Sequence, residues 1–574
     1  MEAQGIATLD KGPTDVWLST LRLQLSRVDN GSQDYVTTLQ RLRDERLAVE
    51  SVLRILDSRI NMYTPIARLP NELLLSIFLH LVCAEKYERI PSMLHVPRTV
   101  PWVRFAWVCR RWRHVMLTSP ALWRHFVLPL PAQWARTLLA RSQQMPIIIS
   151  CSSHHLDYAA TSPEWRLPFD TLERVKTIDL LHFKGTLSDI VPLLCTAAPI
   201  LEVAKIYSDR PVTVSTRTLF ADCAPRLHEL AIRHTPAFTN TSSFMRNLIS
   251  LDITHYTLSY SSVPQFLAVL QQLSRVETLV IKDCLEAFGK TNSGPLRASQ
   301  TAQLPSLRKL AISGLVSECV GFLRHIQTPD TIELHVASSA PDEDVMGDFS
   351  SLYPFIVPTR GYAERPFRAV CFQSKTPLTL LFTASHTYRG PHTRAFEFKW
   401  VYSSYTIVDL VRALFKKIGA HHLWSLSIRL DMHRRADDFV HWAADDFVHR
   451  TAELLDMLGG ATELRRLEAT EPEATALCMA LSATKEENGE WRQKGPGAVL
   501  AWPRLHDLLF ERKTGYELAW MLTDHALLDA LERRHRHGTS LDTLHLLGYE
   551  VDPHCLRKLE GIVGRVVVEN RDAE

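Results

Sequence analysis

The sequence predicts an α/β protein, with helices in its first 130 residues and then a curved parallel sheet that carries helices on its outer face. Two observations support this prediction. Apolar residues recur at helical spacing between residues 39 and 126, and a six-residue pattern with apolar first, fourth and sixth positions recurs after Leu130. Helical spacing indicates amphipathic helices, whereas a strand pattern repeated at short intervals indicates stacked strand–helix units.

Composition and charge narrow the function classes. The 574 residues leave room for several domains or for one elongated array. With 65 Lys and Arg against 63 Asp and Glu, the formal net charge is +2, so no global field attracts nucleic acid. No run of 18 apolar residues and no signal-peptide core in residues 1–13 are present, so we expect no membrane partner and a cytoplasmic or nuclear location. The ten cysteines lack a C-x-x-C pair and are expected to be reduced.

A narrow apolar seam precedes Thr64. Its members follow alternating three- and four-residue steps, broken only by Arg46, and they are Leu39, Leu42, Val49, Leu53, Leu56 and Ile60. This spacing predicts a helix of about twenty residues. Two arrangements are open: the seam pairs with another chain as a coiled coil, or it packs back on the helices that follow.

A second helix is predicted after Leu69. Pro70 lies near its first position, where the missing N–H of proline does no harm. The apolar residues that recur at helical spacing are Leu73, Leu74, Ile77, Phe78 and Leu81. Leu75 and Leu79 make this helix apolar nearly all round, so we expect burial on two sides, with another chain supplying the second cover.

The residues after Trp102 predict two more helices. The first has an apolar face of Phe105, Val108, Cys109, Trp112, Val115 and Met116, with Arg110, Arg111 and Arg113 off that face. Ser119 and Pro120 stop this helix and start the next, with Ser119 as the expected N-cap. Tryptophan is favoured in binding hot spots, and this short region has four, at positions 102, 107, 112 and 123.

These segments together resemble an F-box, the motif that docks a protein onto the Skp-type adaptor of a cullin–RING ubiquitin ligase. Three blocks match in order: LP-x-E-L-x-x-x-I-F-x-x-L from Leu69, V-C-R-x-W-R from Val108, and P-x-L-W from Pro120. The spacer Cys83–Pro101 is longer than the usual link. In this respect the segment resembles the expanded F-box-like proteins of mushroom-forming fungi.

The resemblance implies a non-catalytic substrate-recognition subunit of an SCF-type ubiquitin ligase. Its partners would be the Skp-type adaptor, cullin through that adaptor, and a protein target. The residues that the resemblance assigns to adaptor binding are Leu69, Pro70, Glu72, Leu73, Ile77, Phe78, Leu81, Val108, Cys109, Trp112, Pro120, Leu122 and Trp123. The alternative is an interaction scaffold that keeps the F-box fold but joins no ligase.

The strand pattern predicts the rest of the chain. Its regular copies begin at Val175, Leu201, Leu227, Leu248, Val276 and Leu307, and looser copies begin at Thr331, Phe367, Thr393, Leu423, Leu464, Leu505, Leu541 and Val563. The early copies are spaced like leucine-rich repeats, and helical patterns such as Phe266–Leu273 lie between them. Each unit cannot bury its own apolar face, so neighbours must stack into a solenoid. These irregular repeats resemble those of F-box proteins with leucine-rich regions.

A Pro-x-Leu step enters four of these strands, at Pro199, Pro225, Pro305 and Pro503, because proline ends the preceding helix. We expect the solvent side of the strands to bind the target. The candidates there are Lys176, Asp179, His228, Glu229, Asp252, Glu277, Arg308 and Lys309. Both signs of charge occur, so no target class follows.

Four parts are predicted: an N-terminal helical segment (1–62), the F-box (63–128), a regular solenoid (129–340) and its irregular continuation (341–574). Pro341–Pro366 is rich in acidic residues, Gly and Pro and is expected to be an insertion or a domain joint. The duplicated ADDFVH of Ala436–His441 and Ala444–His449 is interpreted as solvated helix positions rather than a metal site. Lys485–Lys494 is expected to be a polar surface loop.

No catalytic signature appears. The chain lacks G-x-G-x-x-G, a Walker loop, H-E-x-x-H, G-x-S-x-G and the kinase motifs, so we expect no enzyme activity of its own, no cofactor and no metal. The basic run Arg533–His537 is short and lies in a neutral array, whereas a nucleic-acid groove shows a broader basic footprint. We therefore expect no nucleic-acid partner.

Overall fold

A computed structural model gives the fold of the chain. It describes residues 13–29, 34–84, 101–128, 130, 132–151, 166–180, 192–207, 219–233, 243–254, 263–289, 301–329, 331–340, 349–357, 366–376, 379–387, 393–400, 407–429, 451–452, 454–470, 473–485, 491–493, 499–512 and 520–569. The chain divides into two compact units, residues 1–147 and residues 148–574. Each unit is described by itself.

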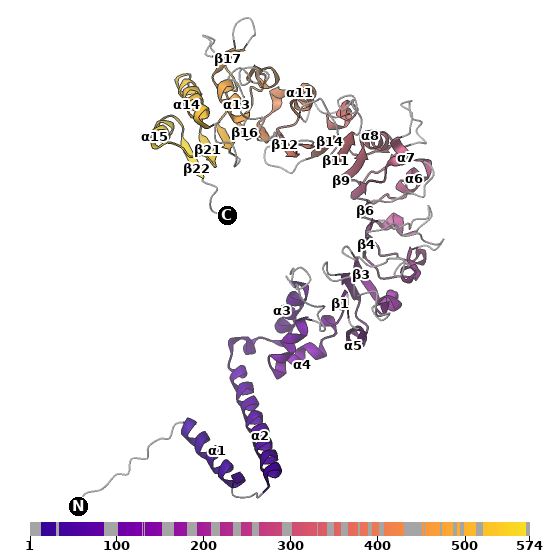
Figure 1. Cartoon of the computed structure of the whole chain (residues 1–574). Helices are drawn as coiled ribbons and strands as arrows, with labels where there is room; N and C mark the ends of the chain where they lie inside the picture. Colours follow the sequence, from indigo (N-terminus) through magenta and orange to yellow (C-terminus); the bar gives the residue numbers. More distant parts are fainter. Residues whose placement is uncertain are drawn as a thin grey trace, which may run out of the picture. The chain divides into compact units, whose positions relative to one another are not determined.

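The first unit is mainly helical. Its elements are α1 (Pro13–Asp29), α2 (Tyr35–Met62), η1 (Pro65–Arg68), α3 (Asn71–Ala84), η2 (Pro101–Trp107), α4 (Arg110–Thr118), η3 (Pro120–Leu122), β1 (His125–Leu128) and α5 (Ala132–Ser142), where η denotes a 3-10 helix. Figure 1 shows α3 and α4 side by side, and the two helices contact each other.

The N-terminal segment holds two helices rather than one. The predicted helix is α2, which is longer than expected, at 28 residues. Asp34 caps it, because its Oδ1 accepts a hydrogen bond from the backbone N–H of Val36 at 3.4 Å. The preceding helix α1 was not predicted. None of the residues of α2 is buried, so the structure does not show its seam packed back on the F-box helices.

The predicted helix over residues 105–116 is shorter than the sequence indicated. Residues 101–107 form the 3-10 helix η2, and α4 begins only at Arg110. The reason is that Cys109 is the N-cap of α4: its φ and ψ of −157° and 167° are extended, and its Sγ accepts a hydrogen bond from the N–H of Trp112 at 3.4 Å. Phe105 and Val108 therefore precede the α-helix instead of belonging to its apolar face.

The second unit is built on one large sheet. Its strands are β2 (Ile147–Cys151), β3 (Val175–Leu180), β4 (Val203–Tyr207), β5 (Glu229–Arg233), β6 (Ser250–Thr254), β7 (Thr278–Lys282), β9 (Lys309–Leu315), β11 (Glu333–Ala340), β12 (Ala369–Thr376), β13 (Thr379–Ser385), β14 (Arg394–Trp400), β15 (Ser425–Arg429), β16 (Arg466–Thr470), β20 (Asp507–Glu511), β21 (Thr543–Leu547) and β22 (Arg565–Glu569). All the strands that the recurring pattern predicted are present in this sheet.

Many of the described connections between strands contain helices. They contain η6 (Phe169–Arg174), η8 (Leu193–Cys195), η9 (Leu219–Asp222), η10 (Ser243–Asn247), α6 (Val263–Leu270), α7 (Glu286–Gly289), α8 (Val316–Arg324), α10 (Tyr353–Ile356), α11 (Ile407–Ile418), η12 (Ala420–His422), α13 (Glu473–Leu481), α14 (Trp520–Arg536) and α15 (Pro553–Ile562). Figure 1 shows α6, α7 and α8 together on one side of the strands, and α11, α13 and α14 likewise lie to one side of their strands. The helices in the described parts of the links from β3 to β6 are short 3-10 helices, whereas α-helices occur in the described links after β6.

The strands from β3 to β11 form an uninterrupted parallel ladder. Their order in space follows the sequence, and equivalent pattern positions face each other, as Leu230, Leu251 and Leu279 do across β5, β6 and β7. These three leucines are fully buried. The predicted stacking of parallel strands between residues 178 and 334 is thus confirmed.

A repeated turn leads into these strands. Leu201, Leu227, Leu307 and Leu505, the leucines of the Pro-x-Leu steps, are buried, and each donates its backbone N–H to the carbonyl oxygen three residues earlier at 3.1–3.3 Å. Proline two residues earlier cannot extend a helix, so the chain turns there and delivers the leucine to the core. The prediction that each proline ends a helix is wrong for Pro305 and Pro503, because these two follow the short strands Ala302–Gln303 and Val499–Leu500.

The sheet departs from a simple repeat after β11. In space, β11 is followed by β14, β13, β12 and then β15, which reverses the sequence order of three strands. Strand β13 was not predicted, and it runs antiparallel to both β12 and β14. The copies at Phe367 and Thr393 are therefore not successive stacked units, as the sequence suggested, but the outer strands of a meander inserted in the sheet.

The polar segments of the sequence have varied outcomes. The described part of Pro341–Pro366, which lies between β11 and β12 in the sequence, includes α10, and its role as an insertion or a domain joint stays a prediction. Lys485–Lys494 is not a simple loop, because β18 (Trp491–Gln493) pairs antiparallel with β17 (Ala483–Lys485), which also pairs with β19 (Val499–Leu500). A two-stranded parallel pair joins β8 (Ala302–Gln303) and β10 (Ile326–Gln327). The ADDFVH duplication lies outside the described residues.

Candidate functional site

The F-box region exposes a set of large apolar side chains. Among the described residues of 64–126, the large apolar side chains that are exposed are Ile66, Leu73, Ile77, Trp107, Val108 and Leu117. Trp107 is 69% exposed and Leu73 is 52% exposed. Exposed aromatic and aliphatic side chains gathered in one small domain are typical of a protein-binding surface.

Helix α3 separates an inner face from an outer face. Leu74, Phe78 and Val82 follow four-residue steps and are buried, whereas Leu73 and Ile77, also four residues apart, are exposed. The first turn begins at the predicted proline, since the N–H of Leu74 donates to the carbonyl oxygen of Pro70 at 3.1 Å. The helix thus has one side buried in the domain and a second apolar side exposed, and cover of that second side by another chain stays a prediction.

Aromatic rings close the inner core of the domain. The ring of Phe78 packs edge-on against that of Trp112 with centroids 5.1 Å apart, and Trp102 packs edge-on against Trp123 at 5.0 Å. Trp123 also donates its Nε1–H to the carbonyl oxygen of Met116 at 2.7 Å, so its polar atom is satisfied inside the core. This core needs no partner to be complete.

Arg111 fixes the start of α3 to α4. Its guanidinium donates to the carbonyl oxygens of Ala67 and Leu69 and to Oδ1 of Asn71, the last at 2.9 and 3.1 Å. These acceptors lie in the junction that contains Pro70. Sequence reasoning placed Arg111 off the apolar face and missed this role, because a charged residue at such a position reads as solvated.

The structure sorts the predicted adaptor-binding residues by burial. Exposed are Pro70, Glu72, Leu73, Ile77 and Val108; half-buried are Leu69, Leu81, Cys109, Trp112 and Pro120; buried are Phe78, Leu122 and Trp123. The exposed group is accessible to a partner, whereas the buried group supports the domain core. For all of these residues a part in adaptor binding stays a prediction.

The second unit carries charged residues on the face of the sheet opposite the buried leucines. Neighbouring strands pair these charges: Lys205 Nζ lies 2.7 Å from Glu229 Oε1, and Lys176 Nζ lies 3.1 Å from Glu202 Oε2. Tyr207 donates its hydroxyl to Asp252 Oδ2 at 3.4 Å. Burial and the Asp252 carboxylate together raise the pKa of Tyr207 to about 12, so this hydroxyl stays protonated.

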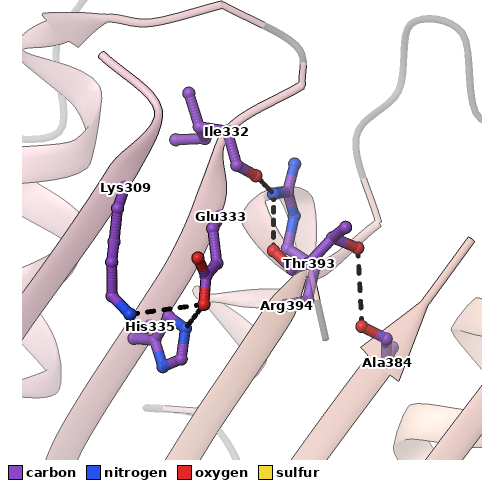
Figure 2. Close-up of polar contacts among 7 residues, drawn as sticks. All are labelled: Lys309, Ile332, Glu333, His335, Ala384, Thr393 and Arg394. Atoms are coloured by element: carbon purple, nitrogen blue, oxygen red, sulfur yellow. Dashed lines mark hydrogen bonds and ion pairs between the residues drawn. The ribbon is translucent and has the colours of Figure 1, made fainter. Parts of the chain in front are cut away.

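Figure 2 shows a further cluster at the junction of β9, β11 and β14. Glu333 Oε1 lies 3.4 Å from Lys309 Nζ and 2.7 Å from His335 Nε2. Burial raises the pKa of Glu333, but the hydrogen bonds and charges of His335 and Lys309 outweigh it, so the net pKa lies below the ordinary carboxyl value. Beside it, the buried Arg394 donates Nη1 to the carbonyl oxygens of Ile332 at 2.6 Å and Thr393 at 3.1 Å.

The predicted target-binding residues belong to these internal contacts. Glu229 pairs with Lys205, Asp252 with Tyr207, and Lys309 with Glu333. Glu277 lies 3.5 Å from Arg308, and His228 Nδ1 lies 3.3 Å from the carbonyl oxygen of Arg226. Their contacts lie within the sheet, so the structure singles out no unsatisfied charge as a target anchor among them.

A more enclosed cluster, missed from the sequence, lies on β15 and β16. The Glu468 carboxylate is 2.6 Å from Arg466 Nη2 and 3.0 Å from Arg429 Nη2, with only 13% of its side chain exposed. Burial raises the pKa of Glu468, but the hydrogen bonds and charges of Arg466 and Arg429 lower the pKa by more. The net pKa therefore lies below the ordinary carboxyl value. Arg429 and Glu468 lie in two loose copies of the strand pattern, and the sequence of those copies does not show that the two side chains meet.

The basic run at the end of α14 does not form one exposed patch. Arg534 is fully buried and donates Nη1 and Nη2 to the carbonyl oxygens of Ala501 and Trp502, both at 2.8 Å. Arg533, Arg536 and His537 instead line an open pocket with Asp529 and Ser482. One of the five basic residues thus stabilises the core.

Two classes of site are not seen in the described part of the chain. No group of three or more His, Cys, Asp or Glu residues there is arranged to hold a metal ion. No described helix is both long and apolar enough to cross a membrane.

Comparison with known proteins agrees with the geometry of the first unit. Residues 66–129 match the F-box-like family model. No curated protein matches the chain. The match covers η1 through β1, the segment whose aromatic core and exposed apolar side chains are described above. The chain therefore contains an F-box-like domain at residues 66–129.

Proposed function

We propose that this chain is a substrate-recognition subunit of an SCF-type cullin–RING ubiquitin ligase. F-box domains generally bind Skp-type adaptors, and the observation that carries the proposal is the exposed apolar set on a domain whose own core is already closed. The adaptor would cover Leu73, Ile77, Trp107 and Val108. Burial of these side chains would supply the driving force, at about 25 cal/mol per Å² of apolar surface.

The large sheet would hold the target protein. Its role would be to bring target lysines close to the ubiquitin-charged conjugating enzyme held elsewhere in the ligase, so the chain would act by proximity and break no bonds itself. A cytoplasmic or nuclear location follows from this role. We also propose that the strand–helix units of this sheet are irregular leucine-rich repeats, and that the chain is related to the expanded F-box-like proteins of mushroom-forming fungi.

A paired set of variants tests adaptor docking. Ile77→Asp with Val108→Asp places two charges in the proposed interface without touching the core, and we expect pull-down of a purified Skp-type adaptor to fall at least tenfold. The matched control is Leu47→Asp with Ile55→Asp, which makes the same chemical change on exposed positions of α2. Equal adaptor capture by both variants would reject the docking surface.

Cullin distinguishes the proposal from the scaffold alternative. Affinity purification of the full chain, with and without the Ile77→Asp and Val108→Asp changes, should recover adaptor and cullin together only from the unchanged chain. Recovery of adaptor without cullin would favour the scaffold. Recovery of neither by the unchanged chain would reject the ligase role and leave only the scaffold.

A further inference from the structure

Helix α2 exposes an apolar seam, interrupted only by Arg46, that nothing in the described structure covers. All six seam residues are exposed, from 36% at Leu39 to 63% at Ile60. Helix α1 contacts α2 but leaves these residues open. The helix spans 28 residues, or four heptads and about 42 Å, which is enough for a coiled coil.

The seam follows the heptad positions of a coiled coil. Leu39, Arg46, Leu53 and Ile60 are seven residues apart and take the a positions, whereas Leu42, Val49 and Leu56 take the d positions. Arg46 is the one charged member of this series. Its position decides how a second helix can lie against the first, because a coiled-coil seam is dry at its centre.

A parallel pair of two copies is disfavoured. In that arrangement each a residue faces itself, so Arg46 would meet Arg46 of the second copy inside the seam. Residues at g and the following e also meet, so Glu45 would face Glu50 of the second copy on both sides. Like charges at these positions repel, and the buried arginine pair adds a desolvation cost.

An antiparallel pair removes both conflicts. With a residues facing d residues, Leu42 lies opposite Ile60 of the second copy, and Val49 lies opposite Leu53. Arg46 then faces Leu56, along which its aliphatic stem packs while the guanidinium reaches the edge. At that edge Glu50 already pairs with Arg46 at 3.0 Å and with Arg54 at 3.5 Å within the same helix.

The flanking charges complement each other in this register. Positions e face e and positions g face g in an antiparallel pair, so Arg43 meets Asp57 of the second copy, and Glu45 meets Arg59. By symmetry each contact occurs twice, which gives four opposite-charge pairs. The only like-charge contact is between the two Glu50 residues at the axis, where Arg46 and Arg54 offset it.

We propose that two copies of this chain associate through an antiparallel coiled coil of their α2 helices. The apolar seam supplies the attraction, Arg46 rejects the parallel arrangement, and the four flanking pairs set the register. This association is independent of the F-box surface and would make the protein a dimer whether or not it binds an adaptor.

Light scattering on the full chain tests the association. The unchanged protein should show twice the monomer mass of 65.4 kDa. Leu53→Asp with Leu56→Asp should give a monomer, whereas the matched control Leu47→Asp with Ile55→Asp, off the seam on the same helix, should stay dimeric. A monomeric unchanged chain, or dissociation of both variants alike, would overturn the proposal.

A charge swap tests the orientation and uses no core residue. Arg43→Asp alone should weaken the dimer by roughly tenfold, because two attractive contacts become repulsive. Adding Asp57→Arg should restore the dissociation constant to within about threefold of the unchanged protein. In a parallel dimer these two positions never meet, so failure of the second change to rescue the first would overturn the antiparallel arrangement.

Discussion

The two units of the chain differ in the kind of side chain that they expose. Among the described residues, sixteen of the large exposed apolar side chains lie in residues 16–63, six lie in residues 66–117, and the second unit has two, Ile249 and Leu315. The sheet of the second unit instead carries charges that pair across its strands, such as Lys205 with Glu229. The first unit thus exposes apolar surface that a partner could bury, whereas charged side chains on the sheet of the second unit pair with one another.

This difference separates what holds the chain together from what it offers to partners. In the first unit the tryptophan core is closed, so the exposed apolar residues of α2 and α3 are available for association. In the second unit most large apolar side chains of the described residues are buried where the strands and their connections stack. Recognition by the sheet would therefore depend on the pattern of its paired charges, which gives specificity more than affinity.

The largest expected effect is the loss of the sheet without loss of the F-box. Leu251→Asp with Leu279→Asp places two charges at fully buried, adjacent positions, and each change should cost at least about 3–5 kcal/mol of unfolding free energy. Limited proteolysis should then cleave the middle of the sheet, while adaptor capture continues. Loss of adaptor capture by this variant would show that the two regions are not separable.

Truncation of the F-box tryptophans should give the next largest effect. Trp123 is buried and its Nε1–H is bonded, so Trp123→Ala should destabilise the domain by about 3–5 kcal/mol. Trp112→Ala should cost less, because Trp112 is only half-buried against Phe78. Thermal melts of the full chain followed by circular dichroism measure both; an unchanged melting temperature for Trp123→Ala would contradict the closed core.

The Arg111 contacts predict an intermediate effect on the binding surface. Arg111→Met removes every hydrogen bond to Ala67, Leu69 and Asn71 and should cost about 1–3 kcal/mol in stability of the F-box. The matched control is Arg110→Met, since Arg110 is exposed. We expect adaptor capture to fall only for the Arg111 variant, and equal behaviour of the two would deny Arg111 a positioning role.

Acid should weaken the second unit through Glu468. Its pKa in the folded state lies below the ordinary value of 4.5, so the unfolded state binds the proton more readily. The stabilisation is present above pH 4.5 and is lost as the pH falls through the lower folded pKa. Denaturant unfolding across this range should show a smaller pH dependence for Glu468→Gln, and an identical dependence would exclude this carboxylate as the cause.

The smallest expected effect concerns the charged face of the sheet. Charge reversals at Asp252, Glu277 and Lys309 should each change stability by less than about 0.5–1 kcal/mol, because these pairs are largely solvated. They should nevertheless alter which proteins co-purify with the chain, as measured by mass spectrometry. An unchanged set of co-purifying proteins would separate the sheet face from target selection.

Much of the fold was predictable because burial leaves a periodic trace. Positions one, four and six of the strand pattern fall on buried sites, as Leu248, Leu251 and Ile253 do around β6. The helix of the apolar seam and the two faces of α3 were predictable for the same reason. In each case the spacing of apolar residues within one helix or strand indicates which of its faces is buried.

The unpredicted features depend on relations between distant segments. The strand β13 is buried on both faces, so its sequence TLLFTAS lacks the alternation that marked other strands, and no local spacing reports that β14 pairs with β11. Arg111 and Arg534 look like surface charges until their carbonyl acceptors are known. The site residues that the family motif names include three core residues, since a motif records folding and binding together.

Adaptor binding by the full chain tests the central contrast most directly. Titration calorimetry with a purified Skp-type adaptor would compare the unchanged chain, the Ile77→Asp and Val108→Asp variant, and the Leu251→Asp and Leu279→Asp variant. The account predicts binding by the first and third and at least tenfold weaker binding by the second. Equal binding by all three, or loss only in the sheet variant, would contradict the assignment of partner binding to the exposed apolar surface of the F-box.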